Sequence, residues 1–438
     1  MASPKPLLDR RTLIAGLGAA ALSPMLPMSG WAQVRPLTLQ AKAEKFTPRW
    51  MGPATPVWSL AGPELRANRG DTLDIAFAND LPVRTLPMWR GIDGVPAAEP
   101  LLARPAVAAG GRETLQLPIR HAGTNFCDLG LLGDGRAQPC RGLPFIVRES
   151  EPVLVDRDQV VLIEEWRVGA DGTAIAPGGD PKDTESFHTI NGVTSSDLIG
   201  IPIRANERLR FRFINASHRA VVAFKVENHE VRVMAIDGQP AEPFLARNGA
   251  LVLAPGTRID AFVDVTGSVG TRFLMLLHDG KQEHVFNQLV ISDEPPIRST
   301  PLPPAPPLPS NGLPARLDLK NALRVDLTLG GPQTDWVTPV TFAATSAPAF
   351  RVKPGRTVVL ALTNRAEIPT VFHLHGHHFR LLDRLDDGWK PFWLDTLAIE
   401  AGQTQRIAFA AQHVGRWLIE SMATAWSAPR LVRWYSVE

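Results

Sequence analysis

The chain has 438 residues and carries 46 lysines and arginines against 44 aspartates and glutamates, a formal net charge of +2. A nearly neutral chain without long basic runs does not favour nucleic-acid binding or attachment to an acidic membrane surface. The length suits about three domains. After residue 32, no segment is apolar and long enough to predict a membrane span.

Residues 1–32 have the features of a cleavable export signal. Arg10 and Arg11 precede an apolar run over 13–22, and small residues suited to cleavage follow at 30–32. A run this short is typical of a signal and not of a membrane span. The twin arginines favour the Tat route, which exports folded proteins; an ordinary Sec signal is the alternative. We therefore expect a periplasmic mature chain that starts at residue 33.

Short apolar runs, separated by turn residues, recur through the rest of the chain and predict strands. They are rich in Val, Ile, Leu and Phe, and Gly, Pro, Asn or Asp lies between them. Helical periodicity is sparse, so the sequence predicts an all-β fold of sandwiches. The strands are expected at 72–77, 160–163, 208–214, 250–253, 259–265, 356–362 and 405–409.

A weak internal repeat divides the chain. In residues 66–75, 203–211 and 350–359 a turn leads into an alternating strand, and Asn79, Asn215 or Asn364 follows. A period of this kind argues for three related domains. The Pro-rich stretch 295–314 predicts an extended linker. We expect domains at 33–150, 151–294 and 315–438.

Two cysteines, Cys127 and Cys140, are present. An oxidising compartment permits a local disulfide between them, which is the favoured interpretation. Two free thiols or a metal thiolate are the alternatives.

Near the C-terminus the chain reads His373-Leu374-His375-Gly376-His377-His378. Alternate residues of a strand point to one face, so His373, His375 and His377 are expected to present their imidazoles to one spot. Strands offer nitrogen ligands to copper or zinc in this way.

Motifs throughout the chain resemble those of the multicopper oxidase family, whose members have three cupredoxin-like domains. The resemblance implies three Greek-key β-sandwiches and covers essentially all of the predicted mature chain. The matching segments are 87–94, 120–124, 189–192, 209–217, 237–240, 253–256, 373–377, 393–397 and 415–417.

At the positions where the resemblance implies copper ligands, this chain has other residues. In the two histidine motifs of the first domain they are Met88, Arg90, Asp128 and Gly130. The last motif has Glu420, Ser421 and Met422, and the remaining mononuclear-site positions have Thr370, Trp426 and Leu431. His373 and His375 are the two ligands that match the family pattern.

Six of the substituted positions are expected to lie around His373 and His375, between the first and third domains: Met88, Arg90, Asp128, Gly130, Glu420 and Met422. There Arg90 could replace the charge of missing copper by pairing with Asp128 or Glu420, since a buried charge must be paired. The alternative is a new zinc or copper site built from His373 and His375, with Asp128, Glu420 and His377 as possible additional ligands.

This pattern predicts a non-catalytic binding or scaffold protein with no cofactor and no catalytic residues. It resembles a copper-free branch of the family, typified by the cell-division protein FtsP (SufI), which implies a periplasmic protein partner of the division machinery. The alternative is a copper-binding oxidoreductase of the multicopper oxidase family with a reduced metal complement.

Overall fold

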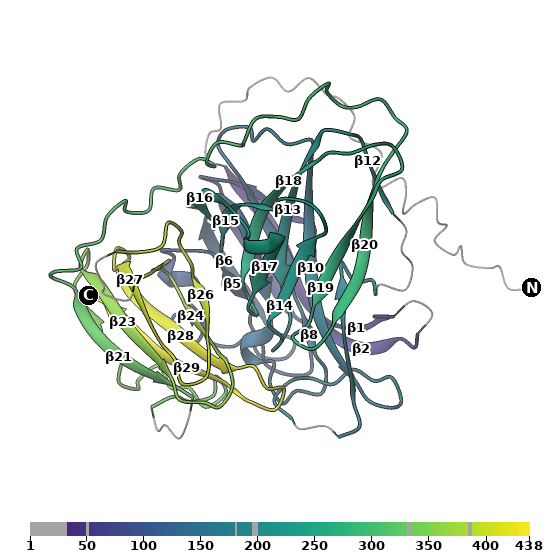
Figure 1. Cartoon of the computed structure of the whole chain (residues 1–438). Helices are drawn as coiled ribbons and strands as arrows, with labels where there is room; N and C mark the ends of the chain where they lie inside the picture. Colours follow the sequence, from purple (N-terminus) through teal and green to yellow (C-terminus); the bar gives the residue numbers. More distant parts are fainter. Residues whose placement is uncertain (1–32, 50–51, 180–181, 195–199, 331–334, 384–387) are drawn as a thin grey trace, which may run out of the picture. The chain divides into compact units, whose positions relative to one another are not determined.

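We describe a computed structural model that covers residues 33–438 except 50–51, 180–181, 195–199, 331–334 and 384–387. The predicted signal, residues 1–32, lies outside the described residues. The regular structure of the described part is made of strands and of three short 3-10 helices, η1 (Pro96–Ala98), η2 (Gly130–Leu132) and η3 (Arg247–Gly249). The predicted all-β fold is confirmed, and each of the seven expected strands coincides with or overlaps an observed strand (Figure 1).

The first sandwich contains residues 34–148. One sheet has the order β6 (Arg112–Pro118), β4 (Thr72–Asn79), β1 (Val34–Phe46), β2 (Thr55–Ala61) and β8 (Cys140–Arg141). The other has the order β3 (Leu65–Asn68), β9 (Leu143–Arg148), β7 (Gly123–Asp128) and β5 (Met88–Arg90). Leu39, Phe77 and Leu117 of one sheet share a core with Phe145 of the other, so alternate residues of both sheets are buried.

The second sandwich contains residues 157–291. One sheet has the order β11 (Glu185–Ile190), β10 (Arg157–Val168), β13 (Glu207–Asn215), β18 (Arg258–Val265), β15 (Arg232–Ile236) and β16 (Gln239–Leu245). The other has the order β12 (Ile201–Ile203), β20 (Glu283–Ile291), β19 (Arg272–His278), β14 (Val222–Val226) and β17 (Ala250–Leu253).

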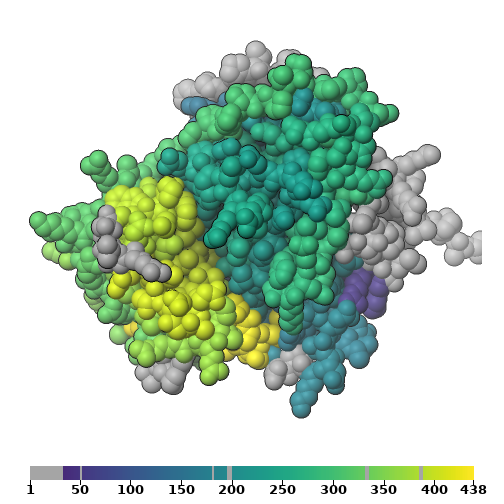
Figure 2. Space-filling view, in the orientation of Figure 1, coloured from purple at the N-terminus to yellow at the C-terminus, as the bar shows by residue number. Residues whose placement is uncertain are grey.

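The third sandwich contains residues 323–437. One sheet has the order β21 (Leu323–Leu329), β23 (Thr357–Asn364), β27 (Thr404–Ala410) and β25 (Arg380–Leu381). The other has the order β22 (Arg351–Val352), β29 (Arg430–Val437), β28 (Gly415–Ala423), β24 (Thr370–Leu374) and β26 (Thr396–Ile399). In Figure 2 its yellow residues lie directly against teal residues of the second sandwich.

The internal repeat corresponds to one strand arrangement used three times. The repeat strand pairs in parallel with the first strand of its sandwich, as β4 with β1, β13 with β10 and β23 with β21. It pairs antiparallel with β6, β18 or β27 on its other side. The repeat noted in the sequence is therefore confirmed as a structural repeat.

The asparagine that ends each repeat strand has the same role in all three sandwiches. Asn79, Asn215 and Asn364 are fully buried. The amide of each donates to two or more backbone carbonyls of neighbouring loops, and its oxygen accepts the N–H two residues ahead. A buried amide must satisfy its donors and acceptor, which explains why asparagine recurs at this point.

The Pro-rich segment, residues 295–314, has no strand and packs along the sandwiches. The guanidinium of Arg298 donates to Asp156 at 2.5 and 2.8 Å, and Leu308 is buried beside Met234 and Phe262. Asn311 exchanges two hydrogen bonds with the backbone of Ala122, at 2.8 and 2.9 Å. The predicted linker is thus tied to the first and second sandwiches.

The expected disulfide is not present, because Cys127 and Cys140 are free thiols. Cys127 lies in β7 and Cys140 in β8, which belong to different sheets of the first sandwich. Both pack in its core. Burial raises the pKa of both thiols, that of Cys140 to about 12, so neither is a reactive thiolate.

Among the described residues, helices of the length and hydropathy needed to cross a membrane are absent.

Candidate functional site

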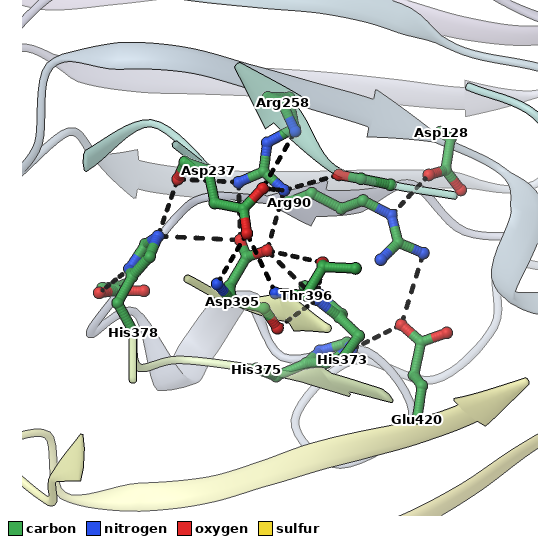
Figure 3. A network of polar contacts seen from close by, with 12 residues as sticks. Arg90, Asp128, Asp237, Arg258, His373, His375, His378, Asp395, Thr396 and Glu420 are labelled. Carbon is green, nitrogen blue, oxygen red and sulfur yellow. Dashed lines mark hydrogen bonds and ion pairs between the residues drawn. The ribbon is translucent and has the colours of Figure 1, made fainter. Parts of the chain in front are cut away.

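A buried network of charged and polar side chains lies where the three sandwiches meet, and we call it the interdomain network (Figure 3). Loops and strand ends of all three sandwiches contribute to it, and most of its side chains are nine-tenths or more buried. Its members are Arg90, Asp93, Glu99, His121, Asp128, Asp237, Arg258, His373, His375, His378, Asp395, Thr396, Glu420 and Arg430, of which His121 and Asp128 are the most exposed.

Arg90 forms the ion pairs that the sequence predicts. It ends β5, and its Nε lies 3.3 Å from Asp128 Oδ2 of β7. Its Nη2 lies 3.6 Å from Glu420 Oε1 of β28, in the third sandwich. The other Glu420 oxygen is paired with Arg430. Asp128 also accepts the backbone N–H of Gly130 at 2.6 Å.

His375 lies between two buried carboxylates. Its Nδ1 is 2.8 Å from Glu99 Oε1 and its Nε2 is 2.9 Å from Glu420 Oε1. Because carboxylates accept hydrogen bonds, both ring nitrogens donate. Burial alone would lower the pKa of His375, but Glu99 and Glu420 raise it to about 9. His375 is therefore an imidazolium that links the first and third sandwiches.

His373, two residues earlier and still in β24, has the opposite protonation state. Its Nδ1–H donates to the backbone oxygen of Asp395 at 3.1 Å, and Thr396 Oγ1 lies 3.0 Å away. Burial and the nearby Arg90 charge lower the pKa of His373 to about 4. The ring is thus neutral, with its lone pair on Nε2.

Arg258 connects the second sandwich to the third. It is fully buried, and two of its nitrogens donate to Asp395 at 2.9 and 2.6 Å. Its Nη1 also lies 3.5 Å from Asp237. Burial and the neighbouring Asp395 charge raise the pKa of Asp237 to about 6. Burial would raise the pKa of Asp395 as well, but Arg258 and His373 hold it well below its usual range.

His378 belongs to the network, although the sequence gave no reason to single it out. Its Nδ1 donates to Asp93 at 2.6 Å and its Nε2 to the Asp237 carbonyl at 2.8 Å. Burial opposes its charge, but Asp93 raises its pKa to about 9. Nothing in the local sequence marks Asp93, His121, Asp237, Arg258 or Asp395 as its neighbours, because they come from separate loops.

The expectation that His377 would face the same spot as His373 and His375 is wrong. Strand β24 ends at Leu374, and Gly376 adopts a positive φ of 73°, so the alternation of side chains stops there. The His377 ring turns into the third sandwich, where Nδ1 is 2.7 Å from Tyr435 Oη and Nε2 accepts the His413 N–H. His377 is therefore not available to the other two histidines.

The other positions that were expected around His373 and His375 divide between two pockets. Met88 lines one together with His373 and His375. Gly130 and Met422 line the other, together with Arg90, Asp128 and Arg430. Met422 Sδ lies 3.1 Å from an Arg219 nitrogen, so it too is in contact with a guanidinium.

Three ligand atoms, one each from His373, His375 and Glu420, lie within 4.8 Å of one another and are close enough to share a metal ion. As arranged, however, this donor set does not fit copper. Both nitrogens of His375 are occupied by carboxylates, and both oxygens of Glu420 by cations. Arg90 and Arg430 place positive charge where a dication would sit. The Nε2 lone pair of His373 remains as a donor.

The sequence matches known proteins in two long segments. Residues 158–292 and 316–438 each match the multicopper oxidase domains that define the family, and together they exceed half of the chain. The chain belongs to the multicopper oxidase family. It is 24% identical over 416 residues to multicopper oxidase MmcO of Mycobacterium tuberculosis, with 82% of this chain and 78% of that protein aligned.

Other relatives match over a smaller share. Laccase-6 of Oryza sativa is 27% identical over 48% of this chain and 39% of its own length, and the laccase of Pycnoporus cinnabarinus is 23% identical over 68% and 65%. The aligned region therefore covers less than half of the length of Laccase-6.

Solved structures of the family share the fold. A multi-copper oxidase from Pseudomonas thermotolerans superposes with a TM-score of 0.76 at 24% identity, over 93% of this chain and all of the other. Lac15 from a marine microbial metagenome gives a TM-score of 0.72 at 24% identity, over 92% and 100%. The predicted cupredoxin-like arrangement of sandwiches is confirmed.

Proposed function

We propose that this member of the multicopper oxidase family has lost its copper sites and acts by binding a partner. The interdomain network carries the proposal. His375 and Glu420 are occupied by internal ion pairs, and the guanidinium of Arg90 lies beside them. These contacts satisfy the buried charges without a metal ion and hold the sandwiches together.

The residues at the mononuclear position support the same proposal. A thiolate is the ligand that carries electrons into a blue copper site. Ser421, buried in β28, has a hydroxyl in its place. Trp426 is also buried, and its Nε1 donates to the Ala176 carbonyl at 3.1 Å, so an indole fills the space of a further ligand. The thiols Cys127 and Cys140 are in the first sandwich.

We further propose that the protein is exported to the periplasm by the Tat route and binds a protein of the division machinery, as FtsP does. The twin-arginine segment and the resemblance to FtsP support this assignment. The nearly neutral charge gives no support for a nucleic-acid partner.

A copper-binding oxidoreductase with a reduced metal complement is the second candidate. The grouping of His373, His375 and Glu420, and the relatives named as oxidases, favour it. For a metal to bind there, His375 would have to lose a proton and Glu420 would have to release a guanidinium.

Copper reconstitution of the purified mature chain tests the proposal. We expect no intense thiolate–copper absorption in the visible range and no oxidation of phenols above a copper-only control. The matched variant is Thr370→His/Ser421→Cys/Trp426→His, which supplies donors at the proposed mononuclear positions and should gain the absorption. A blue wild-type protein, or phenol oxidation by it, would overturn the proposal.

The partner is tested by crosslinking the protein in the periplasm of cells under division stress. We expect division proteins to be enriched relative to an unrelated Tat-exported protein. Equal recovery with both baits contradicts the proposed partner.

A further inference from the structure

A second cluster of metal-ligating side chains lies at the edge of the interdomain network. Asp93 follows β5, His121 precedes β7, and His378 follows β24. One ligand atom from each of the three residues lies within 4.8 Å of the others. We propose that Asp93, His121 and His378 bind one divalent ion of the zinc class and thereby join the first sandwich to the third.

The residue types suit such an ion. Two imidazoles and one carboxylate form a common zinc ligand set, in which water or a fourth residue completes the tetrahedron. Asp93 Oδ2 lies 2.6 Å from His378 Nδ1 and 3.7 Å from His121 Nδ1, so small side-chain shifts are enough to enclose an ion. The His121 side chain is 11% exposed and provides the entry path.

One outer contact orients a ring as a metal site requires. His378 Nε2–H donates to the Asp237 carbonyl, which leaves Nδ1 directed at the cluster; this nitrogen now donates to Asp93 and would release its proton to an ion. Metal-binding histidines are held by such second contacts, often to a backbone carbonyl. The Gln239 amide donates to His121 Nδ1 at 2.9 Å, so an ion bound at this nitrogen would replace that hydrogen bond.

The backbone around the cluster is fixed before any ion binds. Asp93 forms a bridge with Gly376, and the Gly94 N–H donates to the Gly376 carbonyl at 3.2 Å. Gly94 has a positive φ of 68°, and a Cβ there would lie 2.7 Å from His413 Nδ1. Only glycine lets the half-buried His413 ring come this close, so a further imidazole lies beside the cluster.

The charges also favour this cluster over the one at His373 and His375. There, two guanidiniums contact Glu420. Around His378 the nearest charged groups are carboxylates, with Asp395 Oδ2 at 3.8 Å, and the guanidinium of Arg258 is neutralised by Asp395 and Asp237. Asp93 is thus paired with imidazoles, whereas Glu420 is paired with two guanidiniums as well, and a guanidinium cannot lose its charge to admit a dication.

The test uses the full mature chain, stripped with a chelator and then titrated with Zn2+ in a calorimeter and with Co2+ as an optical probe. We expect one equivalent of Zn2+ to bind and the melting temperature to rise, because an ion bound only to the folded state stabilises it. His121→Gln should weaken zinc binding about 100-fold or more, and Asp93→Asn should act in the same direction.

The control variant is His284→Gln in the second sandwich, which should not change the affinity. His121→Gln removes a side chain at the surface of the network, so it remains decisive even where Asp93→Asn fails to fold. Absence of zinc binding, binding unchanged by His121→Gln, or binding lost in His284→Gln would each overturn the proposal. None of these outcomes bears on copper chemistry or oxidase activity, so this inference and the proposed function fail separately.

Discussion

Arg90 is the residue whose removal most directly tests the role of the interdomain network. Its guanidinium is 6% exposed and pairs with Asp128 at 3.3 Å and Glu420 at 3.6 Å. It also packs against the second sandwich, where a Cβ on Gly256 would lie 3.1 Å from its Nη1. The change to make is Arg90→Met, which keeps most of the volume and removes the charge.

The expected loss follows from the burial of the partners. Removing one member of a buried ion pair leaves the other without compensation and costs about 3–5 kcal/mol. A chain of this length has an unfolding entropy of roughly 0.9 kcal/mol/K. If the three sandwiches unfold in one transition, the melting temperature should therefore fall by about 3–6 °C.

Differential scanning calorimetry of the mature chain measures this loss. Arg351→Ala is the matched control, because Arg351 and its partner Glu438 are 59% and 55% exposed. Such a surface pair contributes less than about 1 kcal/mol, so the melting temperature should change by about 1 °C or less. In a double-mutant cycle, Arg90→Met with Asp128→Asn should cost less than the two single changes together. An Arg90→Met protein with the same melting temperature as the wild type would refute the reasoning.

Three further predictions concern other buried groups. Burial lowers the pKa of His188 to about 4, and neither of its ring nitrogens has a partner among the described residues. The folded state therefore resists a proton that the unfolded chain takes up below its ordinary pKa of 6.5, so stability is fully present above that pH and falls towards pH 4. His188→Phe should flatten this part of the stability curve, measured by urea unfolding at each pH; an unchanged slope would exclude His188 as its cause. Asn311→Ala should cost about 2–3 kcal/mol in the same assay, because it leaves the buried Ala122 backbone groups unsatisfied; a loss below about 0.5 kcal/mol would show that the Pro-rich segment does not need this tie. Asp395→Asn should destabilise by about 3–5 kcal/mol, because Arg258 loses the carboxylate that accepts two of its hydrogen bonds; calorimetry that shows no loss would contradict the importance of this pair.

The sequence predicted those features of the fold that depend on local patterns. Alternation of apolar and polar residues marked the strands, and Asn79, Asn215 and Asn364 marked the repeat. In each sandwich this buried asparagine donates its side-chain amide to neighbouring backbone carbonyls. Family motifs also placed Arg90 near Asp128 and Glu420, and the structure confirms both contacts.

Expectations based on spacing alone were less reliable. His377 was expected beside His375, but strand alternation holds only while the strand lasts, and β24 ends at Leu374. The disulfide was expected from the oxidising compartment, which says nothing about geometry; Cys127 and Cys140 occupy different sheets and form no bond.

The sequence by itself determined an all-β chain of repeated sandwiches and the identity of the residues at the positions where the family carries metal ligands. Only the tertiary structure decided what those residues do, because the charge of a buried group depends on neighbours from distant segments. His373 and His375 are two residues apart, yet burial and Arg90 leave one neutral while Glu99 and Glu420 keep the other charged. His378, unremarkable in the sequence, acquires its partner Asp93 from a loop 285 residues away.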